Sequence, residues 1–165
     1  MPLLNCERMK TLIAVAILFF SLTNTLAQSK RIGAHQFHKS KGNHTARIVI
    51  RNEPFDSLKH KIGYDESSGM NLVDGRVAYG AEAVPRTQIK SIAFYFDGQR
   101  VNVPRWLYAD CYNPNLEPGY VKLRFGRDGQ TIFVTMDGAD GAGAYIVVWA
   151  LRQNGRHTRS FKPAF

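Results

Sequence analysis

Cysteine is scarce in this sequence. Only Cys6 and Cys111 occur among its 165 residues, and Cys6 lies in an N-terminal segment that we expect to be removed. A chain left with one cysteine has no internal disulfide, which excludes the disulfide-rich scaffolds of small toxins and growth factors. We expect Cys111 to be buried, because free cysteine is among the most buried residue types. Pairing between chains and a reactive thiol are the alternatives.

Motifs of the common enzyme classes are also missing. The sequence has no Gly-x-Ser-x-Gly elbow, no His-Glu-x-x-His helix, no phosphate-binding loop and no dinucleotide fingerprint. Asp and Glu number 13 against 22 Lys and Arg, so carboxylates are sparse and no glycosidase pair is visible. The sequence therefore favours a protein that is not an enzyme and that needs no cofactor.

Clusters typical of metal ligands are weak. His35, His38 and His44 are loosely spaced, and no cysteine or carboxylate lies beside them to complete a site. Asp137 and Asp140 flank a glycine-rich loop, but the further oxygen ligands of an EF-hand are missing. We therefore predict no metal site in either segment.

The longest apolar run, Leu12 to Leu22, is too short to cross a bilayer as a helix. Arg8 and Lys10 precede this run, and small residues suited to cleavage follow it in Thr25-Leu26-Ala27. This order predicts a signal peptide over residues 1–27, cleaved near Ala27, and a secreted or periplasmic protein. An uncut N-terminal anchor is the alternative.

The chain is strongly basic, with a net charge of +9. Removal of residues 1–27 leaves 20 basic and 12 acidic residues, a net charge of +8. Such a charge outside the cell favours an anionic partner. We expect an anionic glycan, lipid head groups or an envelope protein, and we do not favour nucleic acid. A soluble protein whose charge serves no partner is the alternative.

Turn dipeptides between apolar-rich segments dominate the second half of the chain. They are Asp97-Gly98, Asp128-Gly129 and Asn154-Gly155. Asx-Gly suits the two-residue type I′ turn of a β-hairpin, because both turn residues need positive φ. The first turn sets Phe94 opposite Val101, and the second sets Leu123 opposite Val134. A weaker hairpin about Asp74-Gly75 sets Leu72 opposite Val77.

The third hairpin is predicted to end the sheet. Tyr145 to Leu151 is apolar on both faces and reads as a central strand. Its partner, Arg156 to Phe161, is polar and basic, as expected of an edge strand that resists pairing with another chain.

These patterns predict an all-β fold: an antiparallel β-sandwich or partly closed barrel of roughly eight short strands, built from hairpins. One short helix is expected near residues 104–112, with Pro104 at its start and Asn113-Pro114 at its end. Residues 28–44 are predicted to be a flexible basic arm, and residues 45–165 a single β domain beginning with a strand at Thr45.

Two groups of basic and aromatic residues are candidate binding residues. The first group, in the predicted helix, is Arg105, Trp106, Tyr108 and Tyr112. The second group, on the last hairpin, is Arg152, Arg156, His157 and Arg159. Aromatic faces beside a guanidinium bind sugar rings, and clustered cations bind phosphate, sulfate or carboxylate. The structural alternative is that the aromatics fill the core and the cations protect an edge.

The predicted function is a small secreted or periplasmic, non-enzymatic binding module for an anionic envelope or extracellular partner. Two alternatives belong to other classes. One is a small enzyme with its site in a barrel cavity. The other is an interaction or inhibitor protein whose exposed edge strand pairs with a partner.

Overall fold

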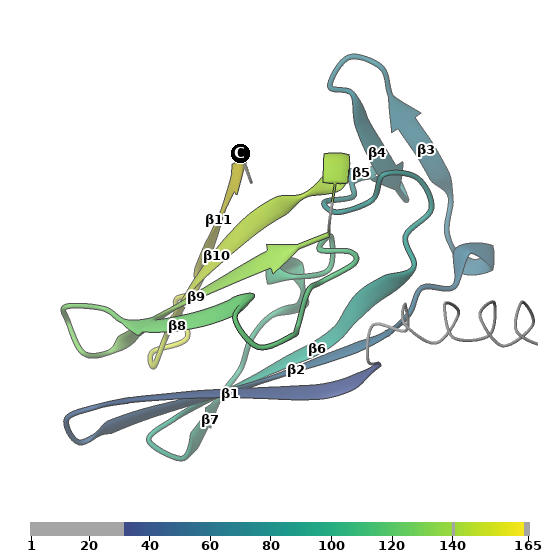
Figure 1. The fold of residues 1–165 in the computed structure, drawn as a ribbon. Helices are drawn as coiled ribbons and strands as arrows, with labels where there is room; N and C mark the ends of the chain where they lie inside the picture. The colour runs from purple at the N-terminus through teal and green to yellow at the C-terminus, as the bar shows by residue number, and fades with distance from the viewer. Residues whose placement is uncertain (1–31, 140, 164–165) are drawn as a thin grey trace, which may run out of the picture. The chain divides into compact units, whose positions relative to one another are not determined.

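The computed structural model describes residues 32–139 and 141–163, which contain eleven strands in three antiparallel sheets (Figure 1). The first sheet has the order β1-β2-β6-β7, with β1 at Gly33–Lys41, β2 at His44–Pro54, β6 at Thr87–Phe96 and β7 at Gln99–Val101. The second has the order β11-β10-β9-β8, with β8 at Val121–Phe125, β9 at Thr131–Gly138, β10 at Tyr145–Arg152 and β11 at Thr158–Pro163. The third has the order β3-β4-β5, with β3 at Ile62–Asp65, β4 at Met70–Val73 and β5 at Arg76–Val77.

One main hydrophobic core joins the two four-stranded sheets. Ile48 and Phe94 enter it from the first sheet, Val134 and Trp149 from the second, and each is at most 1% exposed. Along β2 and β6 buried residues alternate with more exposed ones, as in a strand with one face in a core. The prediction of an all-β, sandwich-like fold is confirmed, and the sheets of the described residues stay open instead of closing into a barrel.

Two predicted two-residue turns are confirmed together with their registers. Asp97 and Gly98 have φ of 48° and 79°, and Phe94 faces Val101. Asp74 and Gly75 have φ of 53° and 75°, and Leu72 faces Val77 in the small third sheet. Positive φ at both central residues is what the type I′ turn requires.

The other two turns differ from the predicted type. At Asp128-Gly129 only the glycine has positive φ, because the Asp128 carboxylate accepts hydrogen bonds from the Gln130 and Thr131 amides. The loop is wider, but Leu123 still faces Val134. At the last hairpin, Ala150 faces Thr158, one residue away from the register of a two-residue turn. There the Arg152 amide donates to the His157 ring instead of to a facing strand.

The prediction of a flexible arm is wrong for residues 33–44. β1 pairs with β2 along its whole length, from Gly33 opposite Asn52 to Lys41 opposite His44. Gly42, with φ of 58°, is the first of the two turn residues, as in a type II′ turn. The β domain therefore includes β1. Residues 28–31 and the predicted signal peptide over residues 1–27 lie outside the described residues.

The predicted helix is reduced to a single 3-10 turn at Arg105–Leu107. In an α-helix the Leu107 carbonyl would accept from the amide four residues later. Here it accepts from Trp149 Nε1 at 2.7 Å and from Arg159 Nη1 at 3.2 Å. The Tyr112 amide meanwhile donates to the Tyr79 carbonyl at 2.8 Å. Contacts with distant segments thus replace the second helical turn.

Candidate anion-binding surface

The predicted aromatic group is divided between surface and interior. Tyr108 belongs to the main core and Tyr112 to a smaller core beneath the third sheet, and each is 6% exposed. Arg105 lies at the surface, where Trp106 is 55% exposed. The four residues therefore do not form one stacking platform, and the two tyrosines serve packing.

The basic group on the last hairpin is divided as well. His157 is buried: its Nδ1 accepts from the Arg152 amide at 3.0 Å, and its Nε2 lies 2.7 Å from the Asn102 carbonyl oxygen. A nitrogen that accepts carries no proton, so the ring proton is on Nε2. Arg152 donates to the Arg156 carbonyl at 2.6 Å, and Arg156 itself is exposed.

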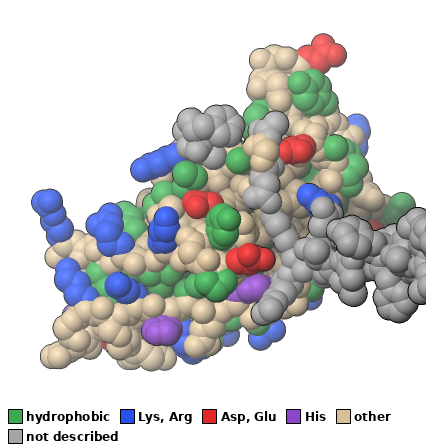
Figure 2. All heavy atoms as spheres, in the orientation of Figure 1, with side chains coloured by type: hydrophobic (Ala, Val, Ile, Leu, Met, Phe, Trp, Pro, Cys, Tyr) green, Lys and Arg blue, Asp and Glu red, His purple; other side chains and the backbone are tan. Residues whose placement is uncertain are grey.

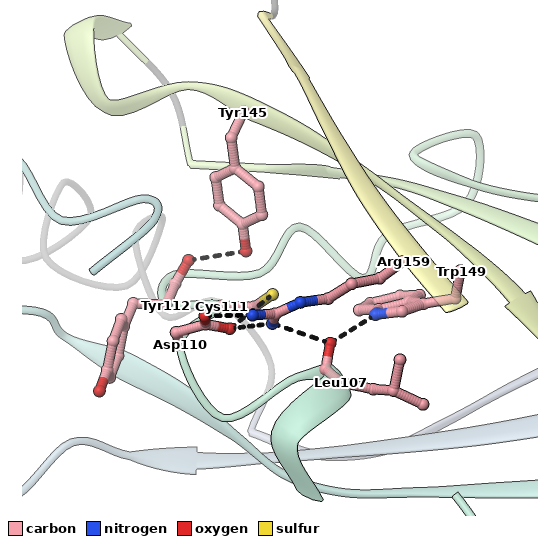
Figure 3. Close-up of polar contacts among 7 residues, drawn as sticks. All are labelled: Leu107, Asp110, Cys111, Tyr112, Tyr145, Trp149 and Arg159. Carbon is pink, nitrogen blue, oxygen red and sulfur yellow. Dashed lines mark hydrogen bonds and ion pairs between the residues drawn. The ribbon is translucent and has the colours of Figure 1, made fainter. Parts of the chain in front are cut away.

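Arg159 points into one end of the sandwich and meets the 105–112 segment there (Figure 3). Its two terminal nitrogens bind both oxygens of Asp110, with Nη2 at 2.7 Å from Oδ2. Nη1 also donates to the Leu107 carbonyl oxygen, which Trp149 shares. The two predicted groups thus meet through Asp110, but the contact fixes a loop to a strand and leaves little of Arg159 for a ligand.

Cys111 lies beneath this ion pair and is fully buried, which confirms the predicted burial. Burial raises the pKa of its thiol, and the nearby Asp110 carboxylate raises it further. The Tyr145 hydroxyl close by donates to the Tyr112 carbonyl at 3.1 Å, and burial raises its pKa too. The thiol is therefore protonated at neutral pH, and this cluster has no ready nucleophile.

Metal-ligand side chains are scattered in the part of the chain that the structure describes. No three of its His, Cys, Asp or Glu residues gather closely enough to hold an ion. Asp140, one of the two aspartates considered for calcium, lies outside the described residues. His35 and His38 lie on β1, whereas His44 binds Asp97 at 2.7 Å.

The solvent face of the first sheet carries a row of basic and aromatic side chains. Strand pairing places His38, Arg47, Tyr95 and Arg100 side by side across β1, β2, β6 and β7. Arg51 lies further along the same face of β2, since alternate residues of a strand share a face. We call these five residues the arginine face. Their sequence neighbours, such as Ile48 and Phe94, point into the core.

The arrangement fixes both the direction and the spacing of the charges. The Arg47 guanidinium lies over the Tyr95 ring, 3.7 Å from its centroid, and this contact orients the guanidinium. Arg47 and Arg100 stand two strands apart, about 10 Å, at the usual strand spacing. Arg47 and Arg51 are four residues apart on one strand, about 13 Å.

Asp97 and Glu53, each two residues along the chain from a member of the arginine face, are already occupied. Asp97 accepts from the Thr45 amide and from His44, both at 2.7 Å, and these bonds lower its pKa. Glu53 is paired with Lys90 at 2.9 Å, and the hydrogen bond from Lys90 lowers its pKa. Within residues 32–139 and 141–163, no carboxylate forms an ion pair with Arg47, Arg51 or Arg100. The arginine face therefore has uncompensated positive charge.

Comparisons with protein-family models, with curated proteins and with solved structures give no match to this chain. Within the described residues, no helix has both the length and the apolar character needed to span a membrane. The functional argument therefore depends on the geometry and charge of the arginine face.

Proposed function

We propose that this protein is a secreted or periplasmic, non-enzymatic binding module for a linear anionic polysaccharide, and that the arginine face is its binding surface. The observation that carries the proposal is that Arg47, Arg51 and Arg100 project from one sheet without a carboxylate partner among the described residues. The net charge of +8 that remains after removal of residues 1–27 supports it by drawing polyanions toward the surface.

The chemistry of arginine suits sulfate and carboxylate groups. A guanidinium is a planar fork that binds such groups through two parallel hydrogen bonds. Strand pairing fixes the backbone of the three arginines, so little backbone freedom is lost when the ligand binds. Their separations of about 10 and 13 Å allow one flexible polymer to reach all three with different anionic groups.

A polysaccharide fits this face better than a bilayer or a nucleic acid. A membrane-docking surface presents apolar side chains for insertion, and single-stranded nucleic acid stacks its bases on free aromatic rings. On the arginine face, the Tyr95 ring is covered by the Arg47 guanidinium. The exposed large apolar side chains, such as Leu58 and Tyr64, belong to other segments.

The test compares two triple variants of equal charge on an immobilised sulfated glycan, with heparin as the probe. One variant removes the arginine face charges (Arg47→Gln, Arg51→Gln, Arg100→Gln). The control removes three exposed charges elsewhere (Arg76→Gln, Arg86→Gln, Arg156→Gln). At about 1 kcal/mol for each arginine, we expect the first variant to bind about a hundredfold more weakly at moderate salt. Its affinity should also depend less on salt concentration.

The outcomes separate the possible partners. Equal losses in both variants would show that the glycan responds only to total charge, which contradicts the proposal. Stronger binding to anionic phospholipid vesicles than to the glycan would assign the face to a membrane surface instead. Circular dichroism of each variant checks that the sheets remain folded.

A further inference from the structure

A groove lies between the edges of the two four-stranded sheets, apart from the three arginines. β1 and β8 are edge strands of different sheets. The groove has a volume of about 410 Å³ and is lined by residues 36–39 of β1 and 121–123 of β8. Its size falls in the range of small-molecule sites, about 300–1,000 Å³.

The lining of the groove combines apolar and basic residues. Phe37 and Leu123 pack against the main core while remaining partly exposed, and Val121 is 8% exposed. Lys39 and Lys122 are exposed on opposite strands. The other two lining residues are Gln36 and His38, so none of the seven is acidic. Figure 2 shows this character: hydrophobic side chains lie next to Lys and Arg side chains on the part of this face where β8 and β1 lie in Figure 1.

A hydrogen bond joins the two strands beyond one end of the groove. Lys41 Nζ donates to the Gly126 carbonyl oxygen at 3.3 Å, next to the turns that follow β1 and β8. The edges of β1 and β8 are therefore held together near their turns, while residues 36–39 and 121–123, which precede these turns, leave a gap in the side of the sandwich. This gap exposes part of the main core to a ligand.

We propose that the groove binds a small organic anion with an apolar body, such as a medium-chain carboxylate. The hydrocarbon part would contact Phe37 and Leu123, which stay partly exposed in the free protein. The carboxylate would lie between Lys39 and Lys122, whose ammonium groups act as compact point charges. The arginine face lacks such an apolar floor, so this site has a different ligand from the polysaccharide.

The experiment follows the methyl resonances of the full chain by NMR during titration with three probes. Octanoate has both features of the proposed ligand, octan-1-ol has only the apolar body, and acetate has only the charge. We expect octanoate to shift the Val121 and Leu123 methyl signals to saturation. Octan-1-ol should bind at least fivefold more weakly, and acetate should cause no saturable shift at these methyls.

Variants separate the groove from general adsorption. The double variant Lys39→Gln, Lys122→Gln should bind octanoate about fivefold to tenfold more weakly. The control pair Lys59→Gln, Lys162→Gln, with the same loss of charge, should bind as the unmodified chain does. Equal weakening by both pairs, or octanoate shifts at Leu58 and Val84 as large as those at Leu123, would overturn the proposal. The arginine face triple variant should retain octanoate binding.

Discussion

The ion pair between Asp110 and Arg159 should stabilise the fold strongly enough to measure. The Asp110 and Arg159 side chains are only 21% and 22% exposed. Removing one partner of a fully buried pair costs about 3–5 kcal/mol, whereas exposed pairs contribute less than about 1 kcal/mol. The intermediate burial here predicts a loss of about 2–3 kcal/mol in the free energy of unfolding for Asp110→Asn or Arg159→Met.

The two single variants are expected to lose stability for different physical reasons. Asp110→Asn removes the negative charge opposite the guanidinium and leaves it only neutral acceptors, such as the Leu107 carbonyl oxygen. Arg159→Met leaves the carboxylate without its cation, 3.9 Å from the Cys111 sulfur. The double variant has neither uncompensated charge, so its loss should be about 3 kcal/mol, smaller than the sum of the single losses.

Urea unfolding at pH 7, followed by tryptophan fluorescence, measures these values. Trp149 is 1% exposed and hydrogen-bonded to Leu107, so its emission reports on this end of the sandwich. The matched control is Lys59→Met, which breaks the exposed pair with Asp56 and should leave the midpoint unchanged. Strictly additive losses, or single variants as stable as the unmodified chain, would refute the reasoning.

Two further predictions concern the turns and the packing of the sheets. Gly138→Ala should lower the free energy of unfolding by about 2–3 kcal/mol, because the added Cβ would overlap the Tyr145 ring. Gly63→Ala, whose Cβ would meet only Leu72 at 3.9 Å, is the control, and an equal effect in both would contradict the packing argument. The folded-state pKa of Asp97 is lowered by the Thr45 amide and by His44, so its contribution is present above about pH 4 and is lost as pH falls further. The Asp97→Asn variant should therefore lose less stability than the unmodified chain between pH 5 and pH 2. Acid titrations followed by circular dichroism measure this loss, and identical acid profiles of the two proteins would contradict the assignment to Asp97.

Local patterns were sufficient to predict most of the hairpins. Asp97-Gly98 and Asp74-Gly75 specify their own turns, so the facing pairs around them follow from the sequence. β1 was missed because it is an edge strand in which Phe37 is the only large apolar residue facing the core side. Its turn signal, Gly42-Asn43, is present in the sequence but stands between polar segments.

The candidate surface depended on pairings that no local pattern specifies. Alternation along residues 45–51 places Arg47 and Arg51 on the outer face of β2. The neighbour that orients Arg47 is Tyr95 on β6. β6 pairs directly with β2, although the strands of the third sheet separate the two in the sequence. The predicted helix likewise failed because Trp149 and Arg159, more than forty residues away, take the Leu107 carbonyl.

The second sheet has a simple order along the chain, with β8, β9, β10 and β11 each beside its predecessor. The first sheet closes only when Ile48 meets Phe94, after the third sheet has been inserted between β2 and β6. Closing so long a loop is slower than forming successive hairpins. We therefore expect the second sheet, from the last part of the chain, and the local β1–β2 hairpin to form early, and the pairing of β2 with β6 to form last.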